Sequence, residues 1–222
     1  MGSSDSYNPL VQMIGLDRAG WPFILGAVAV ALFGAWLGGR WAALPGAVLA
    51  LVFVFFFRDP ERPLPADQSL IVSPADGLVM AVGPAGADAP AGTWQQITIF
   101  LSPLDVHVNR APFSGRVTRV THKAGQFLPA YKPESGAVNE QSEIWVDHDG
   151  RTAVFRQVVG LLARRVVTRV REGETVVVGQ KIGVMKFGSR MDVFLPIALA
   201  VHVRQDDRVV AGETVLARWD GR

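Results

Sequence analysis

The segment VREGETVVVGQKI (residues 170–182) recurs 33 residues later as VRQDDRVVAGETV (residues 203–215). Both copies contain the pattern V-x-x-G-[QE]-x-[IV], in which Gly179 and Gly212 hold the same place. Valine-rich stretches interrupted by a glycine are typical of a strand, a turn and a second strand. Two copies predict a pseudo-symmetric pair of hairpins, because a solenoid needs about three or more repeats.

Short segments of β-type composition continue on both sides of this repeat. The segments expected to form strands lie at 70–72, 77–82, 95–101, 115–121, 152–159, 166–170 and 181–185. Gly, Pro or Asp turns separate them, and no amphipathic helix pattern appears after residue 60. This pattern predicts a mainly β domain, a sandwich or barrel. Its repeated hairpins resemble the paired hairpins of biotinyl domains.

The N-terminal part of the chain has a different composition. Uncharged apolar runs at 21–38 and 41–57 are separated by Gly39 and Arg40. Each run is slightly shorter than the roughly 20 residues that span a bilayer. They predict a helical hairpin that dips into the membrane or just crosses it, as a first domain at residues 1–57. A secretory signal peptide has a single apolar run, whereas a hairpin buried in a protein core is the remaining alternative.

Basic residues flank this hairpin. Arg18 precedes it, and Arg58 and Arg62 follow it. Because positive charge is enriched on the cytoplasmic side, both ends are expected in the cytoplasm. The second domain, at residues 58–222, is therefore expected at the cytoplasmic face of the cell membrane.

The composition excludes several kinds of chemistry. A net charge of +2 gives no reason to expect a nucleic-acid partner. The chain has no Cys, so disulfides, thiolate nucleophiles and Cys-based zinc sites are excluded, and no metal site is predicted. Most of its basic residues are Arg, which suits phosphate recognition. Only four are lysines, Lys123, Lys132, Lys181 and Lys186, and none lies in the Gly-rich turn that pyridoxal phosphate would need.

The stretch MKFGSRMDVFLP (residues 185–196) places two poor strand formers, Gly188 and Ser189, inside β-type sequence. The structural interpretation is a bulge or tight turn. The chemical interpretation is that the Ser189 hydroxyl attacks the Gly188 carbonyl, and that elimination and hydrolysis then leave a pyruvoyl group at a new N-terminus. Such a serine needs a base and benefits from an orienting carboxylate. His107, in FLSPLDVHVNRAP, and Asp76, in IVSPADGLV, are the candidates, although a strand histidine and a turn aspartate are equally ordinary structural features.

Four segments together carry a resemblance to a known family. PADG, SPLDVHVNRAP, ARRV and KFGSRMDVFLP, in this order behind a hydrophobic N-terminus, resemble the phosphatidylserine decarboxylases of the short bacterial and archaeal type. The resemblance implies self-cleavage between Gly188 and Ser189 into a β chain (1–188) and an α chain (189–222). It further implies that Ser189 becomes a pyruvoyl group, and that Asp76 and His107 assist the processing.

One position departs from the pattern of the long forms of this family. They carry a second histidine three positions after the first, where this sequence has Arg110. The two histidines of the long forms divide processing and decarboxylation between them. Here either His107 serves both steps, or another group serves one of them.

The resemblance also implies an activity and its partners. The expected reaction converts phosphatidylserine of the bilayer to phosphatidylethanolamine, in phospholipid biosynthesis, through a Schiff base with the pyruvoyl group and without an external cofactor. Arg110, Arg165 and Arg190 are candidates for binding the lipid phosphodiester, as is Arg164. A homodimer is a further expectation.

Two other classes of protein remain possible from the sequence. GQKIGVMKFG (residues 179–188) resembles the lysine hairpin of biotinyl or lipoyl carriers, with Lys186 as the modified residue on a membrane complex. Phe187 stands where carriers usually have Met, and a carrier does not explain PADG or DVHVNRAP. A structural, membrane-tethered β domain is the third reading.

Overall fold

The computed structural model describes residues 15–161, 166–185 and 188–219. Its contacts divide the chain into two compact units, residues 1–61 and 62–222. The boundary therefore falls slightly later than the one expected between residues 57 and 58, and it assigns Arg62 to the β-rich unit.

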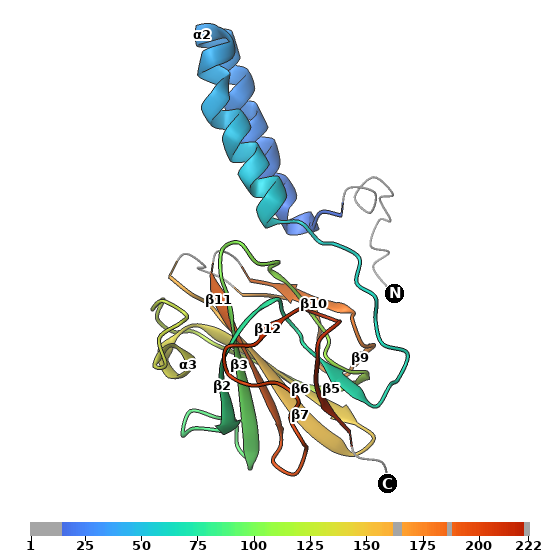
Figure 1. The fold of residues 1–222 in the computed structure, drawn as a ribbon. Helices are drawn as coiled ribbons and strands as arrows, with labels where there is room; N and C mark the ends of the chain where they lie inside the picture. The colour runs from blue at the N-terminus through green and yellow to red at the C-terminus, as the bar shows by residue number, and fades with distance from the viewer. Residues whose placement is uncertain (1–14, 162–165, 186–187, 220–222) are drawn as a thin grey trace. The chain divides into compact units, whose positions relative to one another are not determined.

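The first unit is a helical hairpin. A 3₁₀ turn, η1 (Arg18–Gly20), leads into α2 (Trp21–Phe56), which is interrupted by non-helical backbone at Gly38 and Gly39. The two arms run side by side (Figure 1), and the rings of Phe23 and Phe53 are 5.4 Å apart between centroids. The predicted hairpin is confirmed.

Large apolar side chains cover the outside of this hairpin. Leu32, Trp36, Leu37, Trp41 and Leu51 are each at least 64% exposed. By length and composition alone, the helical segment is long and apolar enough to cross a membrane. A water-exposed surface of this kind is unusual in a soluble protein and indicates a partner or a lipid environment.

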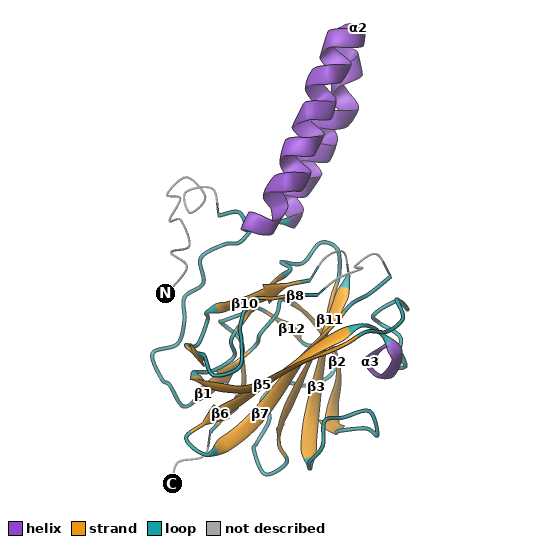
Figure 2. Cartoon of the chain, turned by 180° about the vertical axis from the view of Figure 1, so that it is seen from behind, coloured by secondary structure: helices purple, strands orange, loops and turns teal. Residues whose placement is uncertain are grey.

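The second unit is built from thirteen strands within the described residues. They are β1 (Leu70–Val72), β2 (Gly77–Pro84), β3 (Trp94–Leu101), β4 (Val108–Arg110), β5 (Gly115–Lys123), β6 (Gln141–His148), β7 (Arg151–Val158), β8 (Val167–Thr168), β9 (Thr175–Val176), β10 (Lys181–Val184), β11 (Ser189–Pro196), β12 (Arg208–Val209) and β13 (Val215–Arg218). The large curled sheet has the order β12-β2-β3-β11-β7-β6-β5-β9, beside smaller sheets β4-β10-β8 and β1-β13. Figure 2 shows it from behind, with the short helix α3 (Ser135–Val138) at one side.

Strand β11 lies in the middle of the large sheet. It pairs along its whole length with β3, and its residues 190–194 pair with β7. Side chains alternate between the two faces of a strand. Met191 and Val193 enter the hydrophobic core with Ile97 and Ile99 of β3. Ser189 shares their face, whereas Arg190 belongs to the opposite one.

The sequence repeat is a structural repeat. In each copy a glycine with left-handed backbone follows the first short strand, at Gly179 (φ +78°) and at Gly212 (φ +79°). Each turn is held by one side chain, because Ser114 Oγ accepts the Val178 N–H and Asp76 Oδ1 accepts the Ala211 N–H. The two strands of a copy join different sheets, β9 and β12 in the large one and β10 and β13 in the small ones. Each copy therefore links two sheets.

Most of the expected strands are found. Each of the seven predicted segments contains a strand, and the mainly β fold class is confirmed. Strand β6 was not predicted, although its residues alternate between buried and half-buried positions. It pairs along its whole length with β7 after a two-residue turn at Asp149 and Gly150, both of which have positive φ.

Candidate active site

The Gly188–Ser189 peptide lies where β11 begins. Gly188 has a φ of +76°, in the left-handed region that a side chain rarely adopts. Ser189 is fully buried, and its Oγ has no hydrogen-bond partner among the described residues. A buried hydroxyl without a partner is costly and rare in a folded protein, and it calls for an explanation. The Ser189 hydroxyl is therefore free of hydrogen bonds to the described residues and lies next to the backbone bend at Gly188.

His107 contacts this peptide directly. Its ring is 1% exposed, and its Nε2 accepts a hydrogen bond from the Gly188 N–H at 3.1 Å. Its Nδ1 lies 2.9 Å from the carbonyl oxygen of Asp105. A carbonyl can only accept, so Nδ1 carries the proton and Nε2 presents its lone pair to Gly188. His107 is thus a neutral base one residue away from the Ser189 hydroxyl.

Asp76 lies in the turn before β2, and its described partners belong to other segments. Its Oδ2 accepts from Arg62 at 2.7 Å, and its Oδ1 accepts the Ala211 N–H at 2.8 Å. Burial raises the pKa of Asp76, the Ala211 N–H and Arg62 lower it, and the charge of Asp105 raises it again. The Arg110 N–H donates to the Pro74 carbonyl at 2.9 Å, so the turn of Asp76 lies beside the segment that carries His107.

The pH dependence of stability should report the buried Asp76. Because burial raises the pKa of Asp76 above 3.8 in the folded protein, the folded state binds its proton more tightly than the unfolded chain does. The stability that this carboxyl contributes is then present below pH 3.8 and is lost as the pH rises through the folded pKa. Asp76→Asn should remove this loss, which urea unfolding of both forms over a pH series would measure. If the free energies of unfolding of the two forms changed with pH in parallel, the prediction would be contradicted.

Arg110 contacts the first copy of the repeated turn. Its Nη1 donates to the carbonyl of Gly179 at 3.2 Å, and the residue is 8% exposed. Its described contact therefore lies with the turn that links β9 to β10. The role of Arg110 in binding the lipid phosphate stays a prediction.

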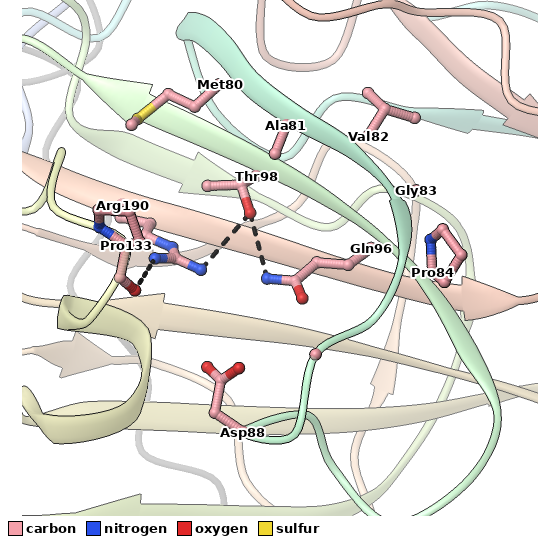
Figure 3. Close-up of a pocket in the computed structure, with 11 residues that line it drawn as sticks. Met80, Ala81, Val82, Gly83, Pro84, Asp88, Gln96, Thr98, Pro133 and Arg190 are labelled. Atoms are coloured by element: carbon pink, nitrogen blue, oxygen red, sulfur yellow. Dashed lines mark hydrogen bonds between the residues drawn. The ribbon is translucent and has the colours of Figure 1, made fainter.

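Arg190 follows Ser189 in sequence but belongs to the other face of the sheet. Its Nε donates to Asp192 Oδ1 at 2.7 Å, and its Nη1 donates to the carbonyl of Pro133. Figure 3 shows its guanidinium beside Thr98 in a cavity of about 460 Å³ that Asp88 also lines. Side chains alternate between the two faces of a strand, so this cavity lies on the opposite face of β11 from Ser189. Arg190 as a lipid-binding residue stays a prediction.

We expect Arg190→Ala to lower the free energy of unfolding. The substitution leaves Asp192, which is fully buried, without its 2.7 Å partner. Breaking a buried ion pair of this kind costs about 3 kcal/mol. Urea unfolding measures the loss, and Arg204→Ala, at an exposed position, is the control. A stability unchanged from wild type, together with a raised KM for lipid, would instead support the predicted contact with substrate.

Some expected residues lie outside the described part of the chain. They are Arg164, Arg165 and Lys186. Within the described residues, no cluster of His, Asp or Glu is suited to hold a metal ion.

Two residues beside the site were missed from the sequence. Arg62 looked like a charge flanking the membrane segment, yet it pairs with Asp76 and, at 3.2 Å, with Glu213. Gly160 follows β7, and its Cα faces the Gly188 carbonyl so closely that a Cβ would overlap the oxygen. An isolated glycine at a strand end is a signal for a close backbone approach and could have identified Gly160.

Comparisons with known proteins identify the family of this chain. A family model described as phosphatidylserine decarboxylase matches residues 49–217. A Solibacter usitatus protein named phosphatidylserine decarboxylase proenzyme is 44% identical over 196 residues, covering 88% of this chain and 93% of the relative. A Symbiobacterium thermophilum protein of the same name is 43% identical over 222 residues, covering 97% and 98%.

The family match and the relatives define an enzyme, a decarboxylase whose relatives are named as proenzymes. The similarity extends over nearly the whole chain, hairpin included, in the Symbiobacterium relative. The chain belongs to the phosphatidylserine decarboxylase family.

Proposed function

We propose that this chain cuts its own Gly188–Ser189 bond and then decarboxylates phosphatidylserine with a pyruvoyl group made from Ser189. The observation that carries the proposal is the site itself. A buried hydroxyl, without a hydrogen-bond partner among the described residues, adjoins a left-handed glycine, and the lone pair of a neutral histidine binds the N–H of this glycine. The proenzyme names of the relatives support a cut into two chains.

The cleavage uses groups of this chain and one water. Ser189 Oγ attacks the Gly188 carbonyl carbon, the C–N bond breaks, and the amide becomes an ester with a free Ser189 amine. Loss of the Ser189 α-proton then breaks the Cβ–Oγ bond, which releases Gly188 as a carboxylate and leaves dehydroalanine. Water converts this residue to a pyruvoyl group and ammonia. His107, whose Nε2 carries no proton, is the proposed base.

The residues present fit such a group. Ser189 is fully buried, next to the His107 ring and at the edge of the apolar core. When formed, the pyruvoyl group supplies a carbonyl that accepts the electron pair released as CO2 leaves the substrate. His107 would then return a proton to the substrate carbon. The apolar surroundings exclude water from this step.

The helical hairpin would keep the enzyme at its substrate. Its exposed apolar surface suits a bilayer, and phosphatidylserine is a bilayer lipid. Arg18 and Arg58 at its ends support a cytoplasmic position for the β-rich unit. A homodimer remains a prediction.

An assay on lipid tests the proposal. The purified protein, added to vesicles that contain phosphatidylserine, should release CO2 and form phosphatidylethanolamine. Sodium borohydride, which reduces ketones, should abolish the activity, whereas chelators should not change it. A protein that carries biotin or lipoate on Lys186 and stays uncut would instead support a carrier.

A further inference from the structure

Gly160 and Gly188 face each other just beyond the end of the hydrogen-bonded pairing between β7 and β11. The last pair of this ladder joins Arg190 to Val158. Continued two residues further, the antiparallel register brings Gly188 opposite Gly160. A Cβ built on Gly160 would overlap the Gly188 carbonyl oxygen and lie 3.0 Å from the carbonyl carbon. The carbonyl group of the bond proposed to be cut therefore occupies the space that a side chain at position 160 would fill.

This requirement concerns space and not backbone conformation. Gly160 has no left-handed φ, so an alanine could adopt its backbone without strain. The clash falls on a backbone oxygen, which cannot rotate away as a flexible side chain can. Another close neighbour of the missing Cβ is Ala130 Cβ, at 3.3 Å. An alanine at position 160 must therefore displace the Gly188 carbonyl or the segment that carries Gly160.

We infer that Gly160 is a positioning residue for self-cleavage, and that its missing side chain makes room for the Gly188 carbonyl oxygen during attack by Ser189. This inference rests on the proposed self-cleavage. As the carbonyl carbon becomes tetrahedral, its oxygen swings out of the peptide plane, and the space beside Gly160 accommodates it. A shift of about 1 Å in a reacting group can cost on the order of 100-fold in rate.

Pulse-chase synthesis of the full chain in the presence of lipid vesicles tests the inference, with the half-time of the precursor as the readout. Gly160→Ala should cut on the order of 100-fold more slowly than wild type. Its precursor should also resist hydroxylamine, which cleaves esters, because the ester would form too slowly to accumulate. Gly86→Ala is the matched control, since among the described residues its Cβ would closely approach just one atom, at the end of the Asp88 side chain.

A double variant separates the carbonyl from the other neighbour. Gly160→Ala with Ala130→Gly removes the contact with Ala130 but keeps the overlap with Gly188, so it should remain slow. Rescue by Ala130→Gly would overturn the inference, as would a Gly160→Ala chain that cuts at the wild-type rate. A Gly160→Ala precursor that proteases degrade would show that the fold needs this glycine, which also overturns it. A wild-type chain that stays whole would refute the proposed function, and the inference with it.

Discussion

Ser189→Ala should leave the chain whole and inactive. Wild type is expected to give two fragments, residues 1–188 and 189–222, the smaller with a keto group at its N-terminus. The variant lacks the only hydroxyl at this bond, so neither the ester nor the pyruvoyl group can form. Ser189 Oγ makes no hydrogen bond in the described structure, so its removal should not destabilise the fold. Intact-mass analysis of both proteins measures the result.

The control for this variant is Ser73→Ala. Ser73 is also fully buried, but its hydroxyl donates to the Ala75 carbonyl in the turn before β2. It should lose some stability and still be cut. A Ser189→Ala protein that yields fragments at residue 188 would contradict the role of Ser189. A wild type that stays whole would return Gly188 and Ser189 to an ordinary bend at the start of a strand.

His107→Gln should slow both self-cleavage and decarboxylation. A glutamine amide can still accept the Gly188 N–H, which keeps the local geometry, but it cannot take up a proton at neutral pH. Removing a general base or acid typically costs on the order of 100- to 10,000-fold in rate. Because Nε2 of His107 contacts the residue next to Ser189, the loss should appear in both steps. The half-time of the precursor and the turnover per cleaved chain measure the two steps separately.

Arg110 stands where the long forms of the family carry a second histidine. The outcome therefore decides whether His107 serves both processing and decarboxylation, or whether another group serves one of these steps. Normal cleavage of His107→Gln, with turnover lost, would show that another group drives the processing and would contradict a double role. His148→Gln is the control, because His148 lies on β6 and its ring stacks on Trp219. It should leave both rates close to those of wild type.

Local patterns were sufficient to predict much of the fold. Strands bounded by Gly, Pro or Asp turns were predicted, and the repeated valine-glycine pattern correctly marked two equivalent turns at Gly179 and Gly212. Strand β6 was missed because its buried positions include the polar Gln141 and Ser142 and a half-buried position carries Trp145, so the alternation in hydrophobicity is weak.

The site could be predicted only where its residues are close in sequence. The Gly188–Ser189 pair stands out because its composition conflicts with a strand, and the structure brings His107 to it. An isolated glycine after a strand could have drawn attention to Gly160, but its place opposite Gly188 depends on the register between β7 and β11, which the sequence alone does not reveal. Arg190 was proposed for lipid binding because it follows Ser189, and this stays a prediction. Neighbours in a strand face opposite sides, so the sequence could already have indicated that the two side chains lie on different faces of the sheet.

The central position of β11 has a consequence for the lifetime of each molecule. If the bond before Ser189 is cut as proposed, the excised piece remains threaded through the middle of the sheet, bonded to β3 on one side and β7 on the other. The segment 189–222 cannot exchange with a newly made copy unless the sheet unfolds. A molecule whose pyruvoyl keto group is chemically modified then stays inactive, and the cell can restore activity only by synthesising new protein.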